Sequence, residues 1–395
     1  MAMDILDHIK QLSLEIHPQL IEWRRHLHQY PELSFQEHNT SKFISKVLQT
    51  YKIPHTTGIA QTGIVALIEG NNPSSRCVAL RADMDALPIL EKNSFDFISK
   101  NKGVMHACGH DFHTSNLLGA AIILQAIRDR FEGTIKLIFQ PSEEKIPSGA
   151  PAMIDAGVLE NPKVEAIFGM HVSPELPTGT FGFRGGQFMA SADEIYLTVK
   201  GKGGHAAFPH TLIDPVLVAA QILINLQQVI SRRKPPFDAG VLSFGKLEAL
   251  GATNIIPDEV KIAGTFRAMN EEFRLKAHDL IKQIAEETAH ASGASCEVNI
   301  LVGYPFLYNN ESLTEDSKQR AKAYNDNIQV LDVPARMGAE DFAYYSQKVP
   351  ACFIRIGTGN EDKGSTNGLH SPNFNVDDEA LLHGAGLLAW LAINQ

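Results

Sequence analysis

Hydrophobic positions at the start of the chain recur every three or four residues. This spacing predicts an amphipathic helix over residues 4–30 and a second helix over residues 37–48. Farther along, short apolar runs alternate with helical segments, and a final helix is predicted over residues 379–391. The alternation predicts an α/β domain whose largely parallel sheet is flanked by helices. Its predicted strands cover residues 77–80, 135–139, 166–170 and 352–356.

The pattern changes between residues 187 and 301. Apolar and polar residues alternate over residues 195–200, which predicts a half-buried strand of an antiparallel sheet. Asp214-Pro215 then opens a helix, with the proline in the first turn, where its missing N–H is harmless. Two strands, a second helix and a last strand follow, so the order βαββαβ predicts an α+β ferredoxin-like unit. We therefore predict that residues 187–301 form a domain inserted into the α/β domain of residues 1–186 and 302–395.

Polar side chains follow three of the predicted strands at the point where each strand ends. Asp83 and Asp85 follow the first strand, Glu143 and Glu144 the second, and His171 the third. An open α/β sheet binds its ligand at the carboxyl ends of its strands. These side chains are therefore expected to gather around one site.

A second feature is the segment of residues 105–113, Met-His-Ala-Cys-Gly-His-Asp-Phe-His, which lies on a turn entering a helix. It places one thiol, three imidazoles and one carboxylate within nine residues, a concentration of metal-ligand chemistry that ordinary packing does not require. We expect part of a catalytic metal site here. Among the flanking residues, His106 and His113 are candidates to orient the ligands rather than to bind the metal.

The adjacent pair Glu143-Glu144 suits metal-assisted hydrolysis. Neighbouring residues just past a strand point in different directions, so one carboxylate can bind a metal while the other handles protons. Taken alone, such a pair is more often a solvated turn, and a lone histidine such as His171 or His370 is more often structural than a ligand. The strand ends and the segment of residues 105–113 favour the functional interpretation.

Composition and charge restrict the partners. The 395 residues suit two domains, with 44% hydrophobic and 20% charged residues. A formal net charge of -10 with scattered Lys and Arg argues against nucleic acid and against an anionic membrane. The N-terminus lacks the pattern of a signal peptide, the longest apolar stretch is about half of the ~20 residues that a membrane span needs, and the four cysteines show no disulfide spacing. We expect a cytoplasmic protein.

Taken together, the motifs resemble the dinuclear-metal aminoacylase and carboxypeptidase family of metallopeptidases. The nearest branch contains amidohydrolases such as hippurate hydrolase and the indole-acetyl-amino-acid hydrolases. The similarity runs from Arg24 to Pro372, through motifs that are ordered and widely separated. They are Arg81-Ala-Asp-Met-Asp-Ala-Leu-Pro88, His106-Ala-Cys-Gly-His-Asp111, Gln140-Pro-Ser-Glu-Glu144, Gly169-Met-His171, Gly203-Gly-His-Ala-Ala-Phe-Pro209 and Gly338-Ala-Glu-Asp-Phe342.

This resemblance implies a role for several residues. Glu143 is the implied general base and acid, and His205, on the inserted lid or dimerisation domain, is the implied oxyanion donor, often across a dimer interface. Asn254 and Arg267 are implied to bind the substrate carboxylate. Two divalent ions are implied, with zinc favoured and manganese, cobalt or nickel permitted by the mixed ligands. The implied ligands are Cys108, His110, Glu144, His171 and His370.

The implied activity is hydrolysis of the amide bond of a small N-acyl amino acid by metal-activated water, with Glu143 moving the proton. A carboxylic acid and a free amino acid are the products, and a homodimer or higher homo-oligomer is expected. Two alternatives stay open: a metallo-dipeptidase or carboxypeptidase of the same family, and a non-catalytic binding protein on this fold. The sequence does not name the acyl group, the amino acid side chain or the native metal.

Overall fold

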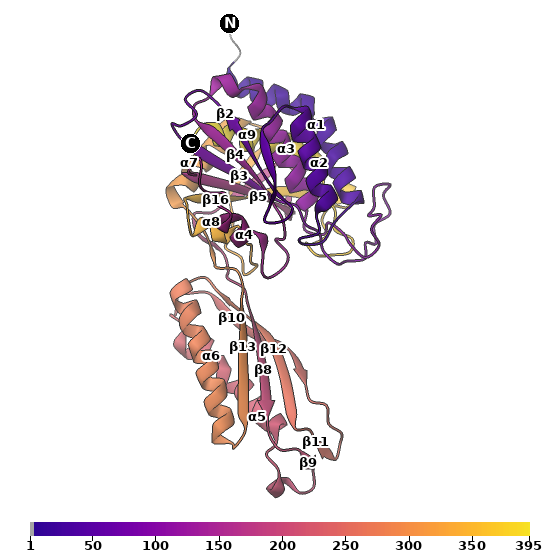
Figure 1. Cartoon of the computed structure of the whole chain (residues 1–395), viewed down its shortest axis with the longest axis vertical. Helices are drawn as coiled ribbons and strands as arrows, with labels where there is room; N and C mark the ends of the chain where they lie inside the picture. Colours follow the sequence, from indigo (N-terminus) through magenta and orange to yellow (C-terminus); the bar gives the residue numbers. More distant parts are fainter. Residues whose placement is uncertain (1–3) are drawn as a thin grey trace. The chain divides into compact units, whose positions relative to one another are not determined.

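The computed structural model describes residues 4–395, and Figure 1 shows the arrangement of its elements. Contacts divide the chain into two compact units. The first unit runs to Gly186 and includes Tyr308–Pro334 and Tyr344–Gln395. The second unit consists of Gln187–Leu307 and Ala335–Ala343. Two short strands, β7 (Gly186–Met189) and β14 (Leu307–Asn309), lie where the chain passes from one unit to the other.

The first unit is built on a large, mostly parallel sheet. Its strands are β1 (His55–Ile59), β2 (Gly63–Glu69), β3 (Cys77–Asp83), β4 (Thr134–Gln140), β5 (Ala166–Pro177), β6 (Thr180–Phe183), β15 (Gln329–Asp332) and β16 (Ala351–Gly359). Within the described residues the spatial order is β1-β2-β4-β3-β5-β16-β6-β15. The central strands β4, β3, β5 and β16 run parallel to one another. These are the four predicted strands, and the outer strands β1, β2, β6 and β15 were not predicted.

Helices cover this sheet (Figure 1). They are α1 (Ile5–Gln29), α2 (His38–Thr50), α3 (His110–Ala126), α4 (Gly149–Asp155), α7 (Glu311–Tyr324), α8 (Ala343–Ser346) and α9 (Leu381–Ile393). Helix α3 is buried along nearly its whole length and packs against both α1 and α9. A Cβ at Gly119 would lie 2.8 Å from side-chain atoms of both Leu20 and Ala385, so glycine allows this close approach. The helix that carries His110 is therefore held rigidly.

The second unit has the order β8 (Asp193–Lys200), α5 (Pro215–Gln228), β10 (Gly240–Glu248), β12 (Glu259–Ala268), α6 (Glu271–Ala291) and β13 (Ser295–Val302). Its main sheet is antiparallel, in the spatial order β10-β12-β8-β13. Helices α5 and α6 pack on each other and on this sheet around a core of their own. A small ladder joins β9 (Gly204–His205) to β11 (Ile255–Ile256). The predicted fold class is confirmed in both of its parts.

The helices of the described residues are too short or too polar to cross a membrane. All four cysteines are buried free thiols.

Candidate metal centre

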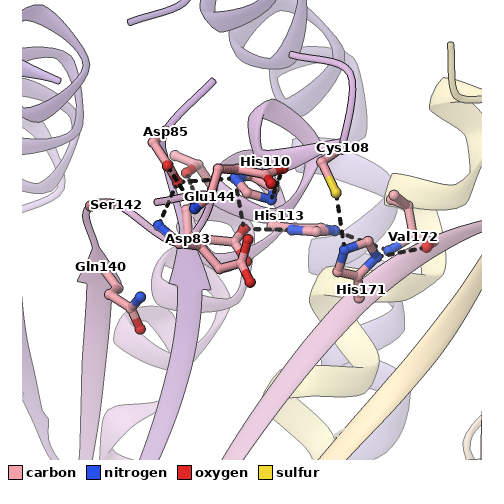
Figure 2. A network of polar contacts seen from close by, with 12 residues as sticks. Asp83, Asp85, Cys108, His110, His113, Gln140, Ser142, Glu144, His171 and Val172 are labelled. Carbon is pink, nitrogen blue, oxygen red and sulfur yellow. Dashed lines mark hydrogen bonds and ion pairs between the residues drawn. The ribbon is translucent and has the colours of Figure 1, made fainter. Parts of the chain in front are cut away.

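The sheet order brings the predicted site residues of the first unit together. Because β4, β3 and β5 are neighbours and parallel, their carboxyl ends lie side by side. Strand β3 ends at Asp83, and the loop after β4 carries Glu143 and Glu144. Strand β5 continues to Pro177, so His171 lies within the strand, and the prediction that it follows the strand's end was wrong. Figure 2 shows the side chains of Asp83, Glu144 and His171 converging with those of the turn that opens α3. Residues that are far apart in the chain thus form one cluster.

The turn before α3 places Cys108 opposite His171. Gly109 adopts φ +85°, a left-handed conformation, and a Cβ there would lie 2.5 Å from Cγ2 of Val172. Only glycine meets both conditions without strain. As a result the Cys108 Sγ lies 3.5 Å from the His171 Nε2 (Figure 2).

Two imidazoles are oriented so that Nε2 faces the cluster. His110 Nδ1 lies 3.2 Å from the Asp85 carboxylate, and His171 Nδ1 lies 2.8 Å from the carbonyl oxygen of Val172. His110 Nε2 is buried and has no hydrogen-bond partner, although it lies 3.9 Å from the Glu144 carboxylate. An imidazole fixed through one nitrogen, with the other nitrogen free, has the arrangement of a metal ligand.

His370 reaches the same cluster from a distant loop. Its backbone amide donates to the carbonyl of Ala107 at 2.8 Å, and its φ is +63°. This places His370 Nε2 3.4 Å from the Glu144 carboxylate, with 53% of the side chain exposed. His370 therefore forms the open, solvent-facing edge of the cluster.

The charge balance of the cluster favours a cation. Burial raises the pKa of the Cys108 thiol well above its usual range, and Glu144 and Glu143 raise it further. Burial alone lowers the pKa of His110, but Asp83, together with Asp85 and Glu144, raises it to about 10. Carboxylates contribute to both shifts, beside the burial that dominates at Cys108, so negative charge is in excess around these two residues. A divalent cation would offset that excess, stabilise a thiolate at Cys108 and favour a neutral imidazole at His110.

The five predicted ligands fall into two groups that share Cys108. Cys108, His110 and His171 offer ligand atoms within 4.8 Å of one another, and so do Cys108, Glu144 and His370. Glu143 belongs to a third such group with His110 and Glu144. The unpartnered Nε2 of His110 and the sulfur, nitrogen and oxygen donors fit divalent transition metals. Their binding of metal stays a prediction.

Asp85 has a larger role than sequence reasoning assigned to it. Its carboxylate accepts the hydroxyl of Ser34 at 2.6 Å and the backbone amides of Glu143 and Glu144 at 2.9 and 3.1 Å, besides contacting His110. One buried carboxylate therefore connects a candidate ligand to the loop that carries the candidate base. The only sequence signal was its position two residues beyond the end of a strand.

The histidine candidates that flank the cluster differ from each other. His113 bridges two strands, since its Nδ1 lies 2.6 Å from the Asp83 carboxylate and its Nε2 accepts the backbone amide of Val172 at 3.0 Å. His113 thus orients the ends of β3 and β5, as a supporting residue would. His106 is buried, with no hydrogen bond to either ring nitrogen.

The remaining predicted residues lie in the second unit, on two different sheets. His205, on β9, pairs with Ile255, and Asn254 directly precedes that residue. Arg267 lies eight residues beyond Glu259 on β12, at the end away from β9 and β11 (Figure 1). At roughly 3.3 Å per residue, that stretch spans about 26 Å. Within this unit, Arg267 is therefore far from His205 and Asn254.

Known proteins are similar to this chain over most of its length. The model of the peptidase family M20/M25/M40 matches residues 79–394. Thermostable carboxypeptidase 1 of Saccharolobus solfataricus is 39% identical over 394 residues, 99% of each chain. The N-acyl-L-amino acid amidohydrolase of Geobacillus stearothermophilus is 43% identical over 298 residues, 75% of this chain and 80% of that one. The crystal structure of a dinuclear metal-binding M20 peptidase from Bacillus subtilis has a TM-score of 0.83 at 37% identity, covering 96% of this chain and 98% of that chain.

Proposed function

Since this chain belongs to the peptidase family M20/M25/M40, we propose that it hydrolyses the amide bond of N-acyl amino acids. A carboxylic acid and a free amino acid are the products. The observation that carries the proposal is the pair of ligand groups sharing Cys108, beside the buried Glu143. The similarity to an N-acyl-L-amino acid amidohydrolase supports the choice of substrate.

Two divalent ions, with zinc favoured over manganese, cobalt and nickel, would bind to Cys108, His110, Glu144, His171 and His370. Bound there, they would supply a water of lowered pKa and polarise the scissile carbonyl. Glu143 takes a proton from the attacking water and returns it to the leaving nitrogen. Its backbone amide is held by Asp85 at 2.9 Å, so its position is set by a buried group. The cluster is mostly buried, which keeps competing solvent away.

The second unit supplies the substrate contacts as a lid and dimerisation domain. His205 donates to the developing oxyanion, and Asn254 and Arg267 bind the substrate carboxylate. Arg267 lies about 26 Å along β12 from the strand end near His205 and Asn254, so one copy of the second unit cannot bring all three to one small substrate. The three roles together therefore require a second copy of the chain, which supports a homodimer or higher homo-oligomer. The four buried free thiols support a cytoplasmic location.

One alternative function is favoured by a specific observation. The thermostable carboxypeptidase of Saccharolobus solfataricus is 39% identical over nearly the whole chain. A carboxypeptidase or dipeptidase could use the same ligands and base, and would differ in how the substrate amine is recognised. A non-catalytic binding protein is disfavoured because every predicted ligand and the predicted base are present.

The test is a screen of N-acetyl and N-benzoyl amino acids, dipeptides and longer peptides with zinc-loaded protein, following amino acid release with and without a chelator. Chelator-sensitive cleavage of the N-acyl amino acids is expected, and a preference for unblocked peptides would favour the alternative. The proposed dimer is tested by mixing His205→Ala protein with Glu143→Gln protein. Activity regained on mixing supports a shared site, whereas no recovery would contradict it.

A further inference from the structure

Three consecutive backbone amides in the loop after β4 donate to buried carboxylates. The amides of Glu143 and Glu144 donate to Asp85, and the preceding amide, of Ser142, donates to Glu37 at 2.9 Å. Hydrogen bonds to an ionised acceptor are about twice as strong as neutral ones. The loop that carries the proposed base and one proposed ligand is therefore fixed by two carboxylates, of which Glu37 comes from an element 105 residues away.

Glu37 is not needed to cap helix α2. It occupies the N-cap position of α2, which favours Ser, Thr, Asp or Asn, and its side chain makes no capping hydrogen bond. The first turn of α2 is satisfied instead by Glu32, which accepts the amides of Asn39 and Thr40 at 2.8 and 2.9 Å. The Glu37 carboxylate is turned to other partners, which suggests a role outside the helix.

The partners of Glu37 connect three segments. Besides Ser142, its carboxylate accepts the Phe35 amide at 2.9 Å and the Thr62 hydroxyl at 2.7 Å. Glu37 has 0% of its surface exposed. Ser142 has φ +52°, a left-handed conformation that is costly for a residue other than glycine. Its carbonyl accepts the Gly149 amide at 2.7 Å, so this strained residue is held on both sides.

We propose that Glu37 is a positioning residue for the reaction: by holding the Ser142 amide, its carboxylate aims Glu143 and Glu144. For the role of Glu143 this inference rests on the proposed function, whereas for Glu144 it concerns metal binding alone. Removal of the charge on Glu37 would weaken the hydrogen bond from the Ser142 amide, which would let the strained turn relax and move both carboxylates. Changes to groups that orient metal ligands cost about 10- to 100-fold in metal affinity or activity.

The buried environment of Glu37 allows its positioning role to be distinguished from a role in stabilising the fold. Burial raises the pKa of Glu37 to about 7, with the Thr62 hydrogen bond lowering it and the charge of Asp85 raising it. Of the groups that face Glu37, Ser142 lies past β4, Thr62 lies before β2, and the charged Asp85 lies past β3. A carboxyl group whose folded pKa is raised destabilises the fold as pH rises from about 4.5 to about 7. A neutral isostere should therefore leave the fold at least as stable at pH 8.

The experiment compares Glu37→Gln with Glu32→Gln, a matched control on a carboxylate that caps α2 without touching the loop. Three quantities are measured at pH 8: the melting temperature, the zinc affinity by chelator competition, and kcat and KM for an N-acetyl amino acid. For Glu37→Gln we expect an unchanged or higher melting temperature, zinc affinity and kcat each lower by about 10- to 100-fold, and KM within about twofold. For Glu32→Gln we expect a lower melting temperature with zinc affinity and kcat unchanged.

The pH dependence of kcat is a second and independent test. Protonation of Glu37 should add to the decline of the wild-type kcat below about pH 7, so this decline should be smaller in Glu37→Gln. Thr62→Val removes a hydrogen bond to the ionised carboxylate of Glu37, so the decline of kcat should move to higher pH. This variant takes the place of Glu37→Gln if Glu37→Gln does not fold. Unchanged kcat and zinc affinity in Glu37→Gln, or losses that only parallel a lower melting temperature, would overturn the role. If the wild-type protein cleaves no N-acyl amino acid, the proposed function fails while the zinc comparison still decides the role of Glu37.

Discussion

Replacing Asp85 by asparagine should disrupt the candidate metal centre more than any change to a single ligand contact. The Asp85 side chain is buried, and its two oxygens have four partners. One oxygen lies 3.2 Å from His110 Nδ1 and accepts the Glu143 amide, and the other accepts the Ser34 hydroxyl and the Glu144 amide. Asparagine replaces one oxygen by an NH₂ group, which would face donors and not acceptors.

The magnitude follows from this arrangement. Whichever oxygen is replaced, two of the four donors lose their acceptor. A hydrogen bond to a charged group contributes about 1.5 to 3 kcal/mol, so the expected loss is about 3 to 6 kcal/mol of unfolding free energy. The His110 hydrogen bond helps to lower the pKa of Asp85 below its usual value despite burial. A depressed carboxyl pKa stabilises the fold above its unfolded value near 4, so the difference from wild type should shrink as pH falls below about 4.

The assay is urea unfolding of the metal-free protein at pH 7 and below pH 4, at about pH 3, together with zinc affinity by chelator competition. Ser34→Ala is the control, because it removes one donor and leaves the other three, with an expected loss of about 1.5 kcal/mol. Zinc affinity should fall about 10- to 100-fold in Asp85→Asn and stay near wild type in Ser34→Ala. An Asp85→Asn protein within about 1 kcal/mol of wild type and with wild-type zinc affinity would refute the reasoning.

Three further changes have defined outcomes. Cys108→Ser should weaken zinc binding, since Cys108 belongs to both ligand groups, and unchanged zinc content would remove it from the ligand set. Gly109→Ala should lower the unfolding free energy by about 2 to 4 kcal/mol, from the left-handed φ and the contact with Val172; a melting temperature equal to wild type would show that the turn relaxes freely. Asp193 pairs with Arg274 at 2.6 Å, and despite burial that contact helps to lower its pKa to about 2. The stability contributed by Asp193 should therefore be present above about pH 4 and lost as pH falls toward 2. The unfolding free energy of Asp193→Asn should change less with pH between these values than that of wild type.

Much of the fold was predictable because the central strands are buried on both faces. Strands β3, β4, β5 and β16 each contain a short, mostly apolar run, and their sequence spacing is that of α/β units. Strands β6 and β15 have four residues each, too few to establish a period in the sequence. Strand β2, with the sequence Gly-Ile-Val-Ala-Leu-Ile-Glu, is an apolar run that the prediction passed over.

The part of the site that was predictable consists of side chains of distinctive chemical type. The family resemblance is confirmed, and Cys108, His110, Glu144, His171 and His370 converge in the first unit. The contacts of Glu37 and Asp85 with the loop after β4 were not predictable, because each joins a carboxylate to backbone amides of residues remote in sequence. Glu37 is 105 residues from Ser142, and Asp85 is 58 residues from Glu143. Neither contact leaves a local pattern in the chain.

The most direct test of the account compares amino acid release by wild type and by Glu143→Gln at equal zinc content. Both proteins are loaded with zinc, the metal is quantified, and the initial rate on an N-acetyl amino acid is measured with and without a chelator. We expect two zinc ions per chain in both proteins, chelator-sensitive release by wild type, and a rate lower by about 10²- to 10⁴-fold in Glu143→Gln. Equal rates at equal zinc content would contradict the assignment of Glu143, and release that is insensitive to the chelator would contradict the metal centre itself.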